Sequence, residues 1–171
     1  MKKKVFFALT LSSGLLVCAD WAMAQNCNIN LALTTPSQRF VDHANGVVTD
    51  THTGLMWKKC LEGQEGGNCF GHPSLAPWEL AASYAQHANT GRFAGYSDWR
   101  LPTLDELESI VETSCQEPSV NLQVFPRTPA AGLWSGNQAD PLAWSLDFSK
   151  GRAFQNLKVG GKYVRLVRNS R

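Results

Sequence analysis

The amino-acid sequence predicts an α+β domain built around an antiparallel sheet. Three observations carry this prediction: short strand patterns joined by tight turns come first, two amphipathic helices follow, and the last third returns to short strands separated by prolines. After the first 24 residues, no repeat, low-complexity tract or apolar run of membrane-spanning length interrupts this order. We therefore expect one domain whose connections include long irregular loops.

Residues 1–24 have the pattern of a secretion signal. A basic start is followed by an apolar run too short to span a bilayer, and Ala22-Met23-Ala24 supplies the motif of a signal peptidase site. The alternative is a lipoprotein signal ending at Cys18, but Val17 is bulkier than the residue that such signals place before the cysteine. We predict cleavage and export of residues 25–171, either to the periplasm or to the cell surface and medium, with no span left in the membrane.

The first strands and both helices have clear local signals. Strand patterns occur at residues 39–42, 47–50 and 55–59. Asn45-Gly46, the strongest hairpin signal in the chain, joins the first two. Pro77 suits the first position of a helix that ends near residues 89–91. Thr103 and Glu106 then form a T-x-x-E capping box, which predicts a second helix over residues 103–112.

The C-terminal third is irregular and basic. Its prolines exclude long helices, and strand patterns occur at residues 133–135, 143–148, 152–157 and 162–168. Residues 25–171 carry 13 basic and 13 acidic side chains, so net charge gives no reason to expect nucleic acid as a partner. Residues 141–171, however, hold seven basic side chains and one acidic side chain, Asp147.

These basic residues are the candidate binding residues. Ammonium and guanidinium groups pair with sulfates and carboxylates, so an anionic glycan or an acidic protein is a plausible partner. The candidates are Lys150, Arg152, Lys158 and Lys162. The alternative is a face that is solvated or paired internally. Arg165 and Arg168 point to opposite sides of one predicted strand, and we expect at least one of them to pair with a carboxylate such as Asp98.

Four cysteines follow the predicted leader. An even number in an exported protein favours two disulfides, for which three connectivities exist. Cys60 and Cys69 flank a loop with three glycines that could close on itself, which leaves Cys27 to pair with Cys115. Because no C-x-x-C motif is present and no histidine has ligand spacing to a cysteine, we expect neither a metal site nor a cofactor.

Several motifs occur in an order that is known from one bacterial family. They are residues 46–50, 53–57, 95–107, 125–126, 133–135 and 163–168. Together they resemble the C-terminal domain of the Legionella collagen-like adhesin, over about residues 39–168. The resemblance implies a variant of the C-type lectin-like fold, with two helices flanking a small antiparallel sheet. It also marks structural ties of the scaffold, namely Trp57, Asp98, Trp99, Arg100 and Arg165.

The resemblance implies binding rather than catalysis. The adhesin domain binds sulfated glycosaminoglycans and extracellular matrix, so we expect an exported, non-catalytic adhesion module for an anionic polysaccharide or a surface protein. One alternative is an envelope or secretion-system accessory that acts through protein contacts. Another is an oxidase like the formylglycine-generating enzymes, which needs reactive cysteines. The loops by which lectin-like domains hold calcium are missing from the sequence, and the oligomeric state stays open.

Overall fold

The computed structural model describes residues 25–171, so the predicted signal peptide lies outside the described residues. In this part of the chain, nine strands, two α-helices and two 3₁₀ turns are present. The strands are β1 (Asn26–Cys27), β2 (Phe40–Asp42), β3 (Val47–Asp50), β4 (Leu55–Lys58), β5 (Cys115–Gln116), β6 (Gly132–Ala139), β7 (Leu142–Asp147), β8 (Arg152–Leu157) and β9 (Val167–Asn169). The helices are α1 (Trp78–Thr90) and α2 (Leu104–Ser109), and the turns are η1 (Ser37–Arg39) and η2 (Phe93–Gly95).

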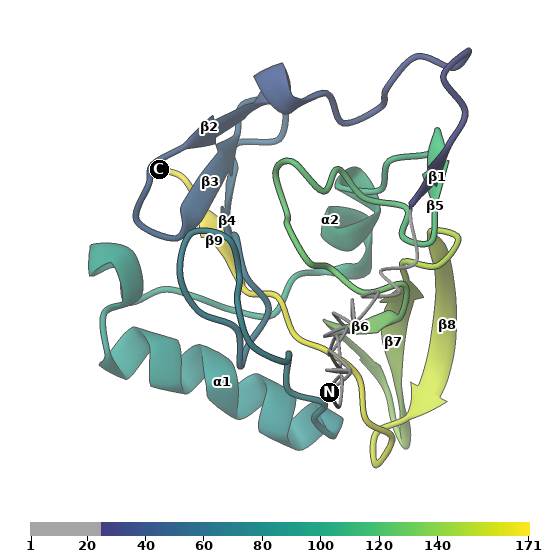
Figure 1. The fold of residues 1–171 in the computed structure, drawn as a ribbon. Coiled ribbons are helices and arrows are strands. Elements are labelled where there is room, and N and C mark those ends of the chain that lie inside the picture. Colours follow the sequence, from purple (N-terminus) through teal and green to yellow (C-terminus); the bar gives the residue numbers. More distant parts are fainter. Residues whose placement is uncertain (1–24) are drawn as a thin grey trace, which may run out of the picture.

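The strands form three separate antiparallel sheets. Their orders are β2-β3-β4-β9, β6-β7-β8 and β1-β5. In Figure 1, α2 lies between the four-stranded and the three-stranded sheet, and α1 runs along the outside of the molecule. No helix in residues 25–171 is long and apolar enough to cross a membrane.

The predicted fold class is wrong. The expected α+β, C-type lectin-like arrangement of two helices flanking one small sheet is not present, because the described residues are mostly β, in three sheets. The strand patterns identified most strands and the hairpin of β2 with β3, but not how the C-terminal strands pair: β9 pairs with β4, whereas β6, β7 and β8 form a sheet of their own. The second helix is also shorter than predicted, and Ile110 already forms its C-cap.

Local signals in the sequence explain where the elements begin and turn. Gly46 has a φ of +89°, which a glycine adopts easily, and it closes the turn from β2 to β3. At α2 the Thr103 hydroxyl accepts a hydrogen bond from the Glu106 amide (3.2 Å), and the Glu106 carboxylate accepts one from the Thr103 amide (2.7 Å). The capping box is therefore confirmed. Arg100 reaches the same carboxylate with both terminal nitrogens, at 2.6 and 2.7 Å.

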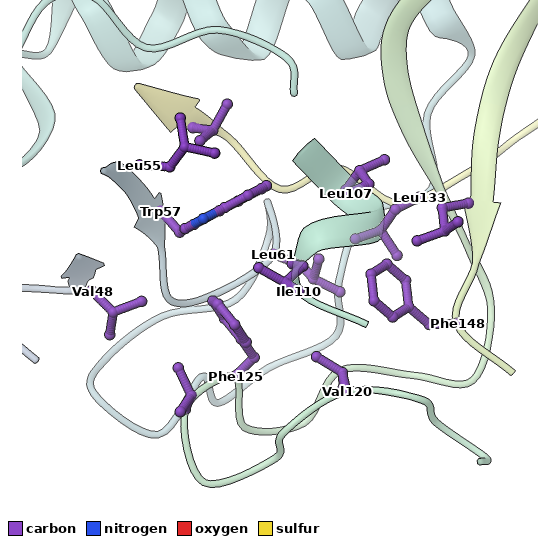
Figure 2. Close-up of a cluster of buried hydrophobic side chains, with 13 residues drawn as sticks. Val48, Leu55, Trp57, Leu61, Leu107, Ile110, Val120, Phe125, Leu133 and Phe148 are labelled. Carbon is purple, nitrogen blue, oxygen red and sulfur yellow. The ribbon is translucent and has the colours of Figure 1, made fainter. Parts of the chain in front are cut away.

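The main hydrophobic cluster joins α2 to both larger sheets. Figure 2 shows Trp57 of β4, Leu107 of α2 and Leu133 of β6 converging with Phe125 from the connection between β5 and β6. The Trp57 and Phe125 rings meet edge to face, with centroids 6.5 Å apart. Truncating such a buried aromatic side chain costs about 3–5 kcal/mol. This cluster holds the three-stranded sheet in place, and with it the surface described below.

Both expected disulfides are present. Cys27 and Cys115 are register partners in the short β1-β5 sheet, so the bond ties the start of the described chain to the segment after α2. Cys60 and Cys69 close the loop after β4. The short β1-β5 pairing itself was not predicted, because two-residue strands leave no periodic signal.

A buried carboxylate also fixes the N-terminal segment, near the Cys27–Cys115 disulfide. Glu112 is 1% exposed, and its two oxygens accept hydrogen bonds from the amides and hydroxyls of Thr34, Thr35 and Ser114. Burial alone would raise the pKa of Glu112, but these donors outweigh it and lower the pKa to about 2. Glu112 therefore acts as an anionic anchor, although the sequence indicated only the end of a helix.

Candidate functional site

Strand β8 gathers several polar and aromatic side chains on one side of the three-stranded sheet. Side chains alternate along a strand, so Arg152, Phe154 and Asn156 share a face. Lys158 comes directly after the strand, two residues beyond Asn156, and continues this alternation. We call this surface the β8 face. Arg152 and Lys158 lie about 20 Å apart, given a rise of about 3.3 Å per residue. β8 is the outer strand of its sheet in Figure 1.

Lys162 reaches the β8 face from the segment that follows the strand. A Cβ atom placed on Gly132 would lie 2.6 Å from Cδ of Lys162, so the lysine stem crosses this glycine. Gly132 is the register partner of Asp147, and Asp147 is the partner of Arg152. Cross-strand partners point to the same side of a sheet, which places the Lys162 side chain on the side that carries Arg152. A larger residue at position 132 would require the flexible lysine side chain to shift.

Lys158 is already engaged within the protein. Its ammonium group donates to the Gln138 side chain (2.8 Å) and to the Asp140 carboxylate (2.9 Å), and it lies 5.0 Å from the centre of the Trp78 ring. Its side chain is 15% exposed. Of the four predicted binding residues, Lys158 is therefore the one whose charge is compensated by the fold.

The other three predicted residues have no carboxylate partner in the described part of the chain. Lys150, in the turn between β7 and β8, Arg152 and Lys162 form no ion pair there. Asp147 is the register partner of Arg152, but its carboxylate accepts a hydrogen bond from the Ser149 amide (2.8 Å) instead. At the end where the chain turns from β7 into β8, the β8 face thus has three cations without an ion-pair partner and one neighbouring carboxylate, that of Asp147.

Two residues of this face were missed at the sequence level. Phe154 is 49% exposed, and Asn156 donates to the Ser145 hydroxyl (2.9 Å) beside it. The signal was present in the alternation of residues 152–157, which the strand prediction covered without assigning its two faces. The aromatic ring supplies an apolar contact between the cationic groups.

The residues that were predicted to have structural roles lie outside the β8 face. Asp98 accepts a hydrogen bond from Nε of Arg168 (2.7 Å), as expected for one of the two arginines, and this bond holds the pKa of Asp98 below its usual range. Trp57 and Trp99 are buried. Six tryptophans occur in the chain, and the four at 57, 78, 99 and 134 are buried, so they are not exposed platforms for sugars.

Arg165 is a buried cation without a carboxylate partner in the described residues. It is 1% exposed, and it donates to the Lys58 carbonyl (3.0 Å), to the Lys59 carbonyl and to the Thr128 hydroxyl (2.8 Å). Its guanidinium carbon lies 4.6 Å from the centre of the Phe125 ring. Burial lowers the pKa of Arg165 to about 9. These contacts tie β4 to the segment before β9, and the group is not accessible to a ligand.

A comparison with known protein families identifies the family of this domain. Residues 46–168 match the family model described as the Lcl C-terminal domain. The chain belongs to this family. The resemblance noted from the sequence is confirmed, and the Lcl C-terminal domain described here is an adhesin-related module. Its two disulfides are compatible with an exported protein. No curated protein matches the chain.

The Lcl C-terminal domain also offers no cluster for a metal ion within residues 25–171. No group of three or more His, Cys, Asp and Glu side chains is arranged there to hold one. All four cysteines of this region are paired in disulfides, so none is a free thiol in the oxidised protein.

Proposed function

We propose that this Lcl C-terminal domain is an exported, non-catalytic adhesion module that binds an anionic, sulfated polysaccharide on the β8 face. The observation that carries the proposal is that Lys150, Arg152 and Lys162 form no ion pair in the described residues, while Arg152 shares its side of β8 with the exposed ring of Phe154. Arginine binds sulfate or carboxylate with two parallel hydrogen bonds, and lysine contributes a mobile point charge.

The shape of the face favours an extended ligand over a single sugar. The cations without an ion-pair partner lie at one end of β8, and Lys158 follows its other end, about 20 Å away. A polyanion that follows the strand meets Arg152 first, passes Phe154 and Asn156, and reaches Lys158, which is held by Asp140. The strength of binding then depends on the length of the chain and on ionic strength.

Heparin chromatography tests this proposal. The variant Lys150→Glu/Arg152→Glu/Lys162→Glu should elute at much lower salt than the natural protein. A variant with the same change in net charge, Arg92→Glu/Arg127→Glu/Arg171→Glu, alters three exposed arginines outside the β8 face. We expect it to elute close to the natural protein. Equal losses in the two variants would show that net charge, and not this face, retains the protein.

A role in protein contacts is the second candidate. Ile29, Leu31 and Leu33 alternate along the N-terminal segment and are 93%, 54% and 54% exposed. An apolar row of this kind fits a surface protein or an envelope partner, and binding through it should persist at high salt. An oxidase of the formylglycine-generating type needs reactive cysteines. Titration of the native protein that finds two or more accessible thiols would favour that chemistry.

A further inference from the structure

The loop between β2 and β3 contains a chemically reactive pair of residues. Asn45-Gly46 is the one asparagine–glycine pair in the sequence. It lies between Asp42, which ends β2, and Val47, which begins β3, and Asn45 is exposed to solvent. Asparagine is among the chemically labile residues of proteins. A glycine after it leaves the side chain open to attack by the next main-chain nitrogen, because glycine has no Cβ atom to block the approach.

The two groups that would react make no hydrogen bond within residues 25–171. The Gly46 amide donates to no carbonyl there, although the Gly46 carbonyl accepts a hydrogen bond from the Lys59 amide (2.9 Å). The side-chain hydrogen bonds of this loop are made by His43 and Asp42, and the Asn45 carboxamide takes part in neither. The nitrogen and the carboxamide can therefore approach each other without breaking a bond to the rest of the described chain.

Other asparagines are held in place by the fold. The Asn89 carboxamide donates to the Trp99 carbonyl (2.9 Å) and accepts from the Trp99 amide (2.6 Å). Asn121 donates to the Thr35 carbonyl (2.8 Å). A carboxamide that is bound in this way cannot turn toward the next main-chain nitrogen without losing its hydrogen bonds. Asn45 differs from these residues both in the glycine that follows it and in the freedom of its side chain.

We propose that Asn45 is a site of spontaneous deamidation in the folded protein. The Gly46 nitrogen attacks Cγ of Asn45 and closes a succinimide ring. The Cγ–Nδ2 bond breaks, and the leaving nitrogen takes up the proton lost by Gly46 and departs as ammonia. Water then adds to one of the two ring carbonyls and breaks its bond to the ring nitrogen. Opening at Cγ yields aspartate, opening at the main-chain carbonyl yields isoaspartate, and no oxidant or reductant is needed.

Both products change the end of the hairpin. Each replaces a neutral amide by a carboxylate three residues after Asp42, whose own carboxylate pairs with Lys59 (2.6 Å). In isoaspartate the main chain also runs through Cβ and Cγ, which inserts one atom before Gly46. A Cβ atom on Gly46 would already lie 3.1 Å from the Phe93 ring, so this junction has little room for a longer chain. We expect the isoaspartate form to unfold at a lower urea concentration than the unmodified protein.

Peptide mapping of the native, oxidised protein tests the proposal. Trypsin releases residues 40–58, a peptide in which Asn45 is the one asparagine and glutamine does not occur. After incubation in mildly alkaline buffer, chromatography and mass spectrometry should find this peptide in three forms, with asparagine, aspartate and isoaspartate. The peptides that contain Asn89 and Asn121 are internal controls, and we expect them to convert severalfold more slowly.

Two further samples separate the effect of the fold from that of the residue pair. Asn45→Gln keeps the carboxamide but would have to close a larger ring, so its peptide should stay in one form. The reduced protein in guanidinium chloride gives the rate of the unfolded chain. A native protein that stays unmodified while the unfolded chain converts would overturn the proposal, as would equally fast conversion of Asn89 or Asn121. Retention on heparin should be unchanged in Asn45→Gln, because the β8 face contains none of these residues.

Discussion

The buried carboxylate of Glu112 gives the sharpest stability prediction. In Glu112→Gln the shape is kept, but the negative charge that accepts six hydrogen bonds is removed. With the amide oxygen in the place of Oε1, the new NH₂ group faces the buried Thr35 amide, which loses its acceptor. Losing hydrogen bonds to a charged acceptor, and leaving one buried donor without an acceptor, costs about 2–4 kcal/mol of stability. We expect a loss of this size in the free energy of unfolding at neutral pH.

The pH dependence of stability gives an independent check on the free energy that Glu112 contributes. The pKa of Glu112 is lowered from 4.5 to about 2 by folding, which corresponds to a stabilisation of about 3 kcal/mol. Because the folded pKa is the lower one, this stabilisation is complete above pH 4.5 and is lost as the pH falls toward about 2. The difference in stability between the natural protein and Glu112→Gln should therefore shrink over this range.

Urea unfolding followed by tryptophan fluorescence at neutral and acidic pH measures both effects. Glu108→Gln is the matched control, because Glu108 is an exposed carboxylate on α2. Its substitution should change stability by less than about 0.5 kcal/mol, as expected of exposed surface sites. If Glu112→Gln behaved like this control, or kept its full deficit at acidic pH, the anchoring role would be refuted.

Two further predictions concern the disulfides and the buried Arg165. Replacing the Cys27–Cys115 pair by serines should destabilise the protein by about 2 kcal/mol more than replacing the Cys60–Cys69 pair, because the loops span 88 and 9 residues; urea unfolding of the two double variants compares them. Arg165→Lys should cost about 2 kcal/mol or more in the same assay, since one ammonium group cannot reach all the acceptors that the guanidinium fork serves; an unchanged midpoint would contradict this.

Elements with local signals were predictable, and their assembly was not. The Asn45-Gly46 turn and the Thr103 capping box are encoded within a few residues, and both occur where the sequence placed them. Sheet partners depend on contacts between distant segments. Trp57 of β4 pairs with Val167 of β9 at the other end of the chain, and no pattern within either strand identifies the other. This explains why one sheet was expected and three are present.

In the candidate site, too, local features were predictable and contacts between distant segments were not. The concentration of basic residues after position 141 was visible in the composition, and alternation along residues 152–157 could have assigned Phe154 and Asn156 to the face. The pairing of Lys158 with Asp140 could not be foreseen, because it depends on how the turn from β6 to β7 meets the end of β8. Contacts of this kind need the fold.

The most direct test of the β8 face is a titration of the isotope-labelled, oxidised protein with a heparin oligosaccharide, followed by NMR chemical shifts of each amide. The oligosaccharide should be long enough to span about 20 Å, the distance from Arg152 to Lys158. We predict that the shifts concentrate on residues 150–158 and on Lys162, and that they fade as salt is added. Shifts centred on any other surface, with β8 unaffected, would contradict the proposed function.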